Sequence, residues 1–110
     1  MAAVDVVERY FACMRDGGRS VADLFHDDAR LIGLGSVVEG RDAIEAFYGA
    51  SVDASSPQPR LLGPLLVDGG RVAAEIEIAL ASGDVLHVVD LFEVDDDRIR
   101  SLTYFLSDHP

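Results

Sequence analysis

The second half of the chain consists of four extended segments joined by very short polar turns, and this feature restricts the fold more than any other. The segments are residues 61–67, 72–81, 85–94 and 99–106, and Asp, Gly and Ser predominate in the turns between them. Turns of this length and composition join neighbouring antiparallel strands. The sequence therefore predicts an antiparallel meander from Arg60 onward.

The first half has the spacing of helices. Apolar residues recur at three- and four-residue steps from Val6 through Tyr10 to Met14, and Gly17-Gly18 ends the pattern, which predicts an amphipathic helix with Tyr10 on its buried stripe. Helices followed by a meander make an α+β domain whose sheet covers the helices with one face. The remaining expected elements are a short helix near Ser20–Phe25, a strand at 29–34, a turn region at 35–40, a third helix from Arg41 to about Gly49 and a loop at 51–59.

Size and charge narrow the class of protein. The chain has 110 residues, of which 49% are apolar, and we expect one domain, residues 1–110, with a single core. Its 9 Arg against 20 acidic residues give a net charge of −11, which opposes binding to nucleic acid or an anionic membrane. The single Cys13 and the lack of a signal-like or membrane-spanning segment lead us to expect a cytoplasmic protein.

One carboxyl interrupts an apolar face. In segment 85–94 the even positions are apolar except for Asp90, which falls between Val88 and Phe92. Because alternate strand side chains share a face, Asp90 is expected to point into the same interior as Tyr10. A buried carboxylate without a partner raises its pKa and takes up a proton, and such carboxyls cluster at functional sites.

Together with Tyr10 and Tyr48, Asp90 indicates a pocket for a small molecule, because apolar walls with a few converging polar groups are typical of such sites. The residues alone leave alternatives open. Asp90 could be paired or at an edge, and an inward Tyr often only fills a core. Histidine and cysteine show no zinc spacing, so no metal is expected.

Several segments resemble the ketosteroid isomerases of the NTF2-like (SnoaL-like) superfamily. The resemblance spans nearly the whole chain, and it implies a curved antiparallel sheet wrapped as a cone around about three helices, with an apolar cavity and commonly a dimer. The segments that carry it are Glu8-Arg9-Tyr10, residues 24–29, residues 40–48, Leu62-Gly63-Pro64 and residues 88–95 followed by Arg98-Ile99.

The resemblance also implies roles for individual residues. In that family a Tyr and a protonated Asp donate hydrogen bonds to the enolate oxygen of the substrate, and these positions fall on Tyr10 and Asp90. A supporting Tyr that hydrogen-bonds the first falls on Tyr48. The family's proton-shuttling Asp falls on Gly33, and no acidic residue occurs between Asp28 and Glu39.

A missing base changes the expected activity. A positioned base is worth about 10²–10⁴-fold and an oxyanion donor about 10²–10³-fold, so efficient steroid isomerisation is not expected. Three functions stay open: a protein that binds a ketone or enolate through Tyr10 and Asp90, a polyketide cyclase-like enzyme with Asp90 as acid and base, and a non-catalytic ligand-binding or scaffolding domain.

The expected partner is an apolar, ring-containing small molecule such as a steroid or polyketide, and no cofactor is implied. A partly apolar outer sheet face, formed by Val89, Leu91, Thr103 and Phe105, further predicts a homodimer. Helix stripes and strand parities give the substrate-binding residues, to which the resemblance adds Gly33: Val6, Met14, Gly33, Phe47, Leu86, Val88, Phe92, Leu102, Tyr104 and Leu106.

Three other patterns carry less weight. Gly33-Leu34-Gly35 begins like a dinucleotide fingerprint, but the third glycine position is Val38, and no helix is expected to open there. Asp95-Asp96-Asp97 lacks the later ligands of a calcium loop and is interpreted as a hairpin turn. His87 falls on the face opposite Asp90 and is interpreted as a surface or interface residue.

Overall fold

The fold is an α+β arrangement in which a curved sheet packs against two α-helices, as the sequence predicts. A computed structural model describes residues 2–18 and 20–107. The elements are α1 (Ala3–Arg15), the single 3₁₀ turn η1 (Val21–Leu24), β1 (Phe25–Gly33), β2 (Ser36–Glu39), α2 (Arg41–Ser55), β3 (Gln58–Leu61), β4 (Leu66–Asp68), β5 (Arg71–Ala79), β6 (Val85–Asp95) and β7 (Arg98–Leu106).

The strands form one sheet in the order β2-β1-β7-β6-β5-β3, with β4 also paired to β5. The long strands β5, β6 and β7 form the predicted meander, whereas β1 pairs with β7 in parallel. The sheet is therefore mixed and not wholly antiparallel. Side-chain periodicity could not show this, because it fixes which face a residue occupies but not the direction of a partner strand.

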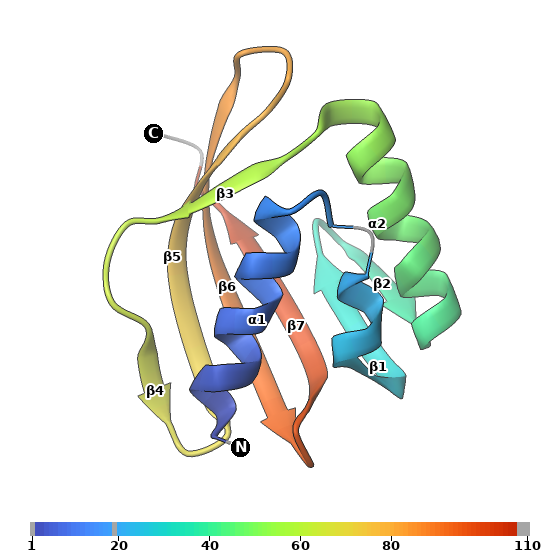
Figure 1. Ribbon diagram of the computed structural model, residues 1–110, viewed down its shortest axis with the longest axis vertical. Helices are drawn as coiled ribbons and strands as arrows, with labels where there is room; N and C mark the ends of the chain where they lie inside the picture. The colour runs from blue at the N-terminus through green and yellow to red at the C-terminus, as the bar shows by residue number, and fades with distance from the viewer. Residues whose placement is uncertain (1, 19, 108–110) are drawn as a thin grey trace.

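Figure 1 shows α1 lying across the face of β6 and β7, while α2 lies beside β1 and β2. The N-terminal helix buries Val6, Val7, Tyr10, Phe11 and Met14 against the sheet. It ends where the Gly18 amide donates to the Cys13 carbonyl at 2.8 Å, with Gly18 at a φ of +71°. The predicted amphipathic helix is confirmed.

Two helix predictions need correction. The expected second helix is only η1, because its four residues lead directly into a strand. The third helix continues to Ser55 and not Gly49, since Gly49 is tolerated inside it and the left-handed Ser56 ends it. The predicted loop at 51–59 is accordingly reduced to a short link before β3.

Strand limits also differ from expectation. β1 begins at Phe25 and so includes Asp27 and Asp28, whose carboxylates pair with Arg41 and Arg100 at 2.8 Å each. Four of the residues expected to form a turn region make strand β2. The expected strand at 61–67 is split into the ends of β3 and β4, because residues 62–65, which include Gly63 and Pro64, interrupt it.

The core lies between α1 and the inner sheet face. Its largest fully buried side chains include Phe11, Phe25, Phe92, Ile44 and Ile76. The outer face carries the partly apolar patch identified in the sequence, with Val89 and Phe105 36% and 55% exposed. The homodimer through this face stays a prediction. In the described part of the chain, no helix combines the length and apolar character needed to cross a membrane.

The β1–β2 hairpin has an unfavourable turn residue. Leu34 and Gly35 connect the paired Gly33 and Ser36, and both have positive φ values, +52° and +75°. Positive φ at both central residues is the requirement of a type I′ turn, for which Asn-Gly is preferred and a bulky Leu is disfavoured. This segment is a hairpin turn and not a dinucleotide-binding loop.

We expect Leu34→Asn to raise the free energy of unfolding by about 0.5–1 kcal/mol, because Asn adopts the left-handed conformation at lower cost. Urea denaturation measures the change. Leu34→Ala is the matched control, because it also removes the 73% exposed side chain but keeps a Cβ in the left-handed region. Equal stabilisation by both substitutions would show that exposure of Leu34, and not its backbone, costs stability.

Candidate functional site

A cavity of about 180 Å³ opens between α1, α2 and the inner face of the sheet. Its wall is almost wholly apolar, and the polar groups on it are three tyrosines, one serine and one carboxyl. The lining residues are Tyr10, Phe11, Met14, Leu31, Leu34, Phe47, Tyr48, Ser51, Pro57, Pro59, Ile76, Ile78, Leu86, Val88, Asp90, Leu102, Tyr104 and Leu106.

Asp90 stands at the centre of the inner sheet face. In β6 it is paired with Ala74 of β5 and Tyr104 of β7, and only 5% of its surface is exposed. Among the described residues, no group makes a hydrogen bond to its carboxyl. Burial therefore raises the pKa of Asp90 from its ordinary value of 3.8 to about 7. The inward orientation predicted from strand parity is confirmed.

Tyr10 and Tyr48 bring their hydroxyls together at 2.7 Å, and either oxygen can be the donor. This hydrogen bond joins α1 to α2, as expected of a supporting tyrosine. The Tyr10 ring is held edge-on against Phe11 and Phe92, with ring centres 5.1 Å away in both pairs. Burial is the main cause that raises the pKa of both tyrosines, and the charge of Asp90 raises both further. Both hydroxyls therefore stay protonated.

Tyr104 is a third cavity tyrosine, and it lies directly over Gly33. A Cβ placed on Gly33 would lie 2.4–2.6 Å from Cε1, Cε2 and Cζ of the Tyr104 ring. Such an approach is far inside van der Waals contact, so residue 33 can be only glycine while the ring keeps this position. Burial, and secondarily the charge of Asp90, raises the pKa of Tyr104.

Most of the predicted site residues lie on the cavity wall. Tyr10, Tyr48 and Asp90 are there, and so are Met14, Phe47, Leu86, Val88, Leu102, Tyr104 and Leu106. Val6, Phe92 and Gly33 do not line it, which corrects their expected contact with substrate. Val6 and Phe92 lie in the core with at most 1% exposure, and the Tyr104 ring covers Gly33.

The sequence analysis missed several wall residues. Leu31, Ile76 and Ile78 lie on the inward parity of β1 and β5, so strand alternation could have identified them. Pro57 and Pro59 follow α2, and their position depends on where that helix ends. No periodic signal in the sequence marks that point.

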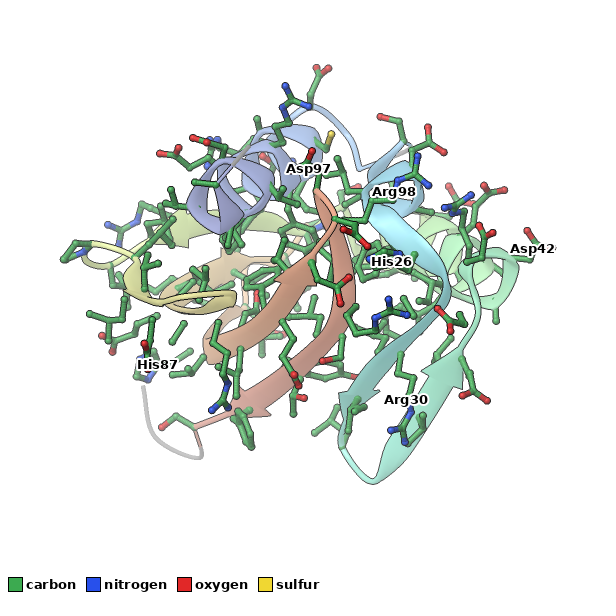
Figure 2. All side chains as sticks on the ribbon, turned by 90° about the horizontal axis from the view of Figure 1, so that it is seen from below. His26, Arg30, Asp42, His87, Asp97 and Arg98 are labelled. Atoms are coloured by element: carbon green, nitrogen blue, oxygen red, sulfur yellow. The ribbon has the colours of Figure 1, made fainter. Side chains whose placement is uncertain are left out.

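The cavity wall has no cationic side chain among its lining residues. Within residues 2–18 and 20–107, no cluster of three His, Cys, Asp or Glu side chains could hold a metal ion. His87 lies on the side of the sheet away from α1 (Figure 2), where its Nε2 is 2.7 Å from Oε2 of Glu75. Asp96 and Asp97 have positive φ in the β6–β7 turn, as expected for a hairpin.

Comparison with known proteins assigns the family. The family model of the SnoaL-like domain matches residues 7–102. The chain therefore belongs to the SnoaL-like domain family and has its NTF2-like fold. No curated protein matches the chain.

Solved structures agree with this assignment. A protein from Sphaerobacter thermophilus is 29% identical, with 97% of each chain covered and a TM-score of 0.83. A polyketide cyclase-like protein from Sinorhizobium meliloti is 23% identical over 92% of this chain and 94% of its own, with a TM-score of 0.82. A ketosteroid isomerase-like protein from Kribbella flavida is 21% identical over 98% and 79%, with a TM-score of 0.87.

The Gly33–Tyr104 contact leads to a prediction about stability. We expect Gly33→Ala to lower the free energy of unfolding by about 1–3 kcal/mol, as in other overpacked sites, because its methyl group would overlap the Tyr104 ring. In a Tyr104→Ala background the same substitution should cost little, and a double-mutant cycle by urea denaturation measures the coupling. Gly49→Ala in α2, where a Cβ meets nothing, is the control. Additive effects would contradict the contact.

The raised pKa of Asp90 leads to a second prediction. Because the folded state holds this proton more tightly than the unfolded chain, stability from Asp90 is fully present below about pH 3.8 and is lost as pH rises through about 7. At about 1.4 kcal/mol per pKa unit, the loss amounts to at most about 4 kcal/mol.

Denaturation of the wild type and Asp90→Asn between pH 4 and pH 8 measures this loss. Their difference in free energy of unfolding should change steadily up to about pH 7 in favour of Asp90→Asn, which cannot ionise. A difference independent of pH would show that the carboxyl is solvated in the folded state.

Proposed function

We propose that this protein binds an apolar ring compound through a carbonyl or enolate oxygen, to which Tyr10 and the neutral Asp90 donate hydrogen bonds. The observation that carries the proposal is the Asp90 carboxyl, buried, without a hydrogen-bond partner among the described residues, and on the wall of an apolar cavity. An unsatisfied buried polar group costs stability, and an oxygen-bearing ligand would satisfy it.

The two donors are suited to an oxygen acceptor. Below about pH 7 the Asp90 carboxyl carries a proton and can donate it in a hydrogen bond. When the Tyr48 hydroxyl donates to Tyr10, the Tyr10 proton is free to point at a ligand. The aromatic rings around Tyr10 hold its hydroxyl in place, which supports preorganised binding of developing negative charge.

The wall also favours some ligands over others. With no cationic side chain lining the cavity, a ligand carboxylate would lose its hydration without a compensating charge. A neutral ketone or phenol loses much less. The names of the ketosteroid isomerase-like and polyketide cyclase-like structures agree with a ligand that carries ketone oxygens.

Efficient steroid isomerisation is not part of the proposal. The position of the expected base is Gly33, and the Tyr104 ring occupies the space that a side chain there would need. Asp90 is the only carboxyl on the cavity wall as the described residues define it. The cavity therefore has oxygen donors but no second carboxyl to move a proton.

A second function is favoured by the pKa of about 7 at Asp90, because an acid–base group works best when its pKa lies near the ambient pH. In this polyketide cyclase-like reaction, the Asp90 carboxylate removes a proton from the carbon beside a ligand carbonyl. Tyr10 donates a hydrogen bond to the enolate oxygen that forms. The protonated Asp90 then returns the proton to carbon, so no other reactant is consumed.

Two measurements with cyclohex-2-enone, which has no titrating group, test these functions. For binding, we expect affinity in the wild type to fall above about pH 7, as Asp90 loses its proton. Asp90→Asn, which keeps a donor of the same size, should retain affinity at all pH values, whereas Asp90→Leu should abolish it. Calorimetry or NMR titration gives the affinities.

For acid–base function, NMR follows exchange of the ketone's carbon-bound protons in deuterated water. Exchange catalysed by the wild type, absent in Asp90→Asn and reduced by about 10²–10³-fold in Tyr10→Phe, would support proton transfer by Asp90. Binding without exchange would support the binding function alone.

Equal affinity in Asp90→Asn and Asp90→Leu would contradict contact between Asp90 and the ligand. If neither cyclohexenone nor any phenol or steroid stabilised the protein against heat, a scaffolding domain would be the better interpretation, since a bound ligand in excess raises the stability of the folded state.

A further inference from the structure

The cavity is smaller than pockets that hold ligands of several fused rings. It encloses about 180 Å³, whereas pockets that bury drug-sized ligands enclose roughly 300–1,000 Å³. An engineered apolar protein cavity of about 150 Å³ binds benzene. By volume, therefore, this cavity matches one six-membered ring.

The Tyr104 ring limits the cavity on the β1 side. Residues 33, 104 and 90 are neighbours on the inner face, since Ile32 is aligned with Thr103 and Tyr104 with Asp90. Over Gly33 no side chain stands in the way, and the ring lies within 2.4–2.6 Å of the place where a Cβ would be. The glycine thus lets the ring enter space next to Asp90 that a second ligand ring would otherwise use.

The mouth of the cavity offers little further burial. Leu34, Phe47 and Leu106 line the cavity and are also 73%, 38% and 38% exposed. They therefore form its opening to solvent. A ligand ring beyond the first would extend past this rim into water, where it buries little apolar surface and gains little affinity.

We propose that Gly33 and Tyr104 together determine ligand size, so that the cavity takes a single six-membered ring bearing one carbonyl or phenolic oxygen and disfavours fused polycyclic ligands. This inference rests on the proposed function, because Asp90 and Tyr10 are taken to hold the ligand oxygen. Tyr104 acts by shape, and its hydroxyl is not required for the size limit.

The test compares the affinities of phenol, 2-naphthol and estradiol, which carry one, two and four rings with the same phenolic group. Wild-type protein is expected to bind phenol at least as tightly as the larger two. Tyr104→Ala should reverse this order and bind 2-naphthol about tenfold more tightly than the wild type does, because the second ring becomes buried.

Two variants are matched controls. Tyr104→Phe keeps the ring without the hydroxyl and should keep the wild-type order. Phe105→Ala changes the next residue of β7, which is 55% exposed and faces away from the cavity, and should also keep that order. If circular dichroism shows that Tyr104→Ala is unfolded, Tyr104→Leu, which also removes the aromatic ring, takes its place.

The outcomes separate the size limit from the proposed function. Wild-type protein that binds estradiol more tightly than phenol, with binding lost in Asp90→Leu, would overturn the size limit and leave the proposed function standing. An unchanged order in a folded Tyr104→Ala or Tyr104→Leu would overturn the role of Tyr104. If no variant bound any of the three phenols, the proposed function would fail, and the size limit with it.

Discussion

The packing of α1 against the inner face of the sheet is the contact on which the site depends. Tyr10, Phe11 and Phe92 interlock edge-to-face at this contact, with ring centres 5.1–5.8 Å apart. Such aromatic pairs have preferred geometries, so they fix the position of the helix as well as burying apolar surface. At one end of this packed region, α2 and the inner strands enclose the cavity.

The same packing removes water from Asp90. Its carboxyl lies on a sheet face that is otherwise apolar, and desolvation alone is enough to raise its pKa to about 7. The Tyr10–Tyr48 hydrogen bond satisfies both of those hydroxyls, whereas Asp90 has no such partner in residues 2–18 and 20–107. The fold thus leaves one unsatisfied carboxyl beside a preorganised hydroxyl pair, which is the chemical basis of the proposed site.

Within the SnoaL-like family, this chain combines those oxygen donors with an unusual wall. Glycine at residue 33 and tyrosine at residue 104 fit each other, because only the absence of a Cβ lets the ring lie where it does. The missing base and the small cavity then have a common structural cause. Substituting an acid for Gly33 would not by itself restore a base, since the Tyr104 ring would have to move first.

Much of this could be predicted from the sequence. Helical spacing placed Tyr10 on the buried stripe of α1, and strict alternation in β6 placed Asp90 on the inner face. Both patterns reflect local geometry, in which the period of the backbone decides the face that a side chain occupies. The α+β class followed from the order of the elements for the same reason.

Other features depended on contacts between distant segments. The parallel pairing of β1 with β7 and the extension of α2 to Ser55 are set by what those elements pack against. Val6 and Phe92 have the right periodicity for the cavity, yet the other rings of the core cover them. The same holds for Gly33 and Tyr104.

The sequence by itself determined the class of fold, the inward faces of its helices and strands, and the polar groups available to a site. Only the tertiary structure decided which of those side chains surround open space, how large that space is, and that Tyr104 covers Gly33. The physical reason is that periodicity is a property of neighbouring residues, whereas a cavity is defined by the packing of side chains from elements far apart in the chain.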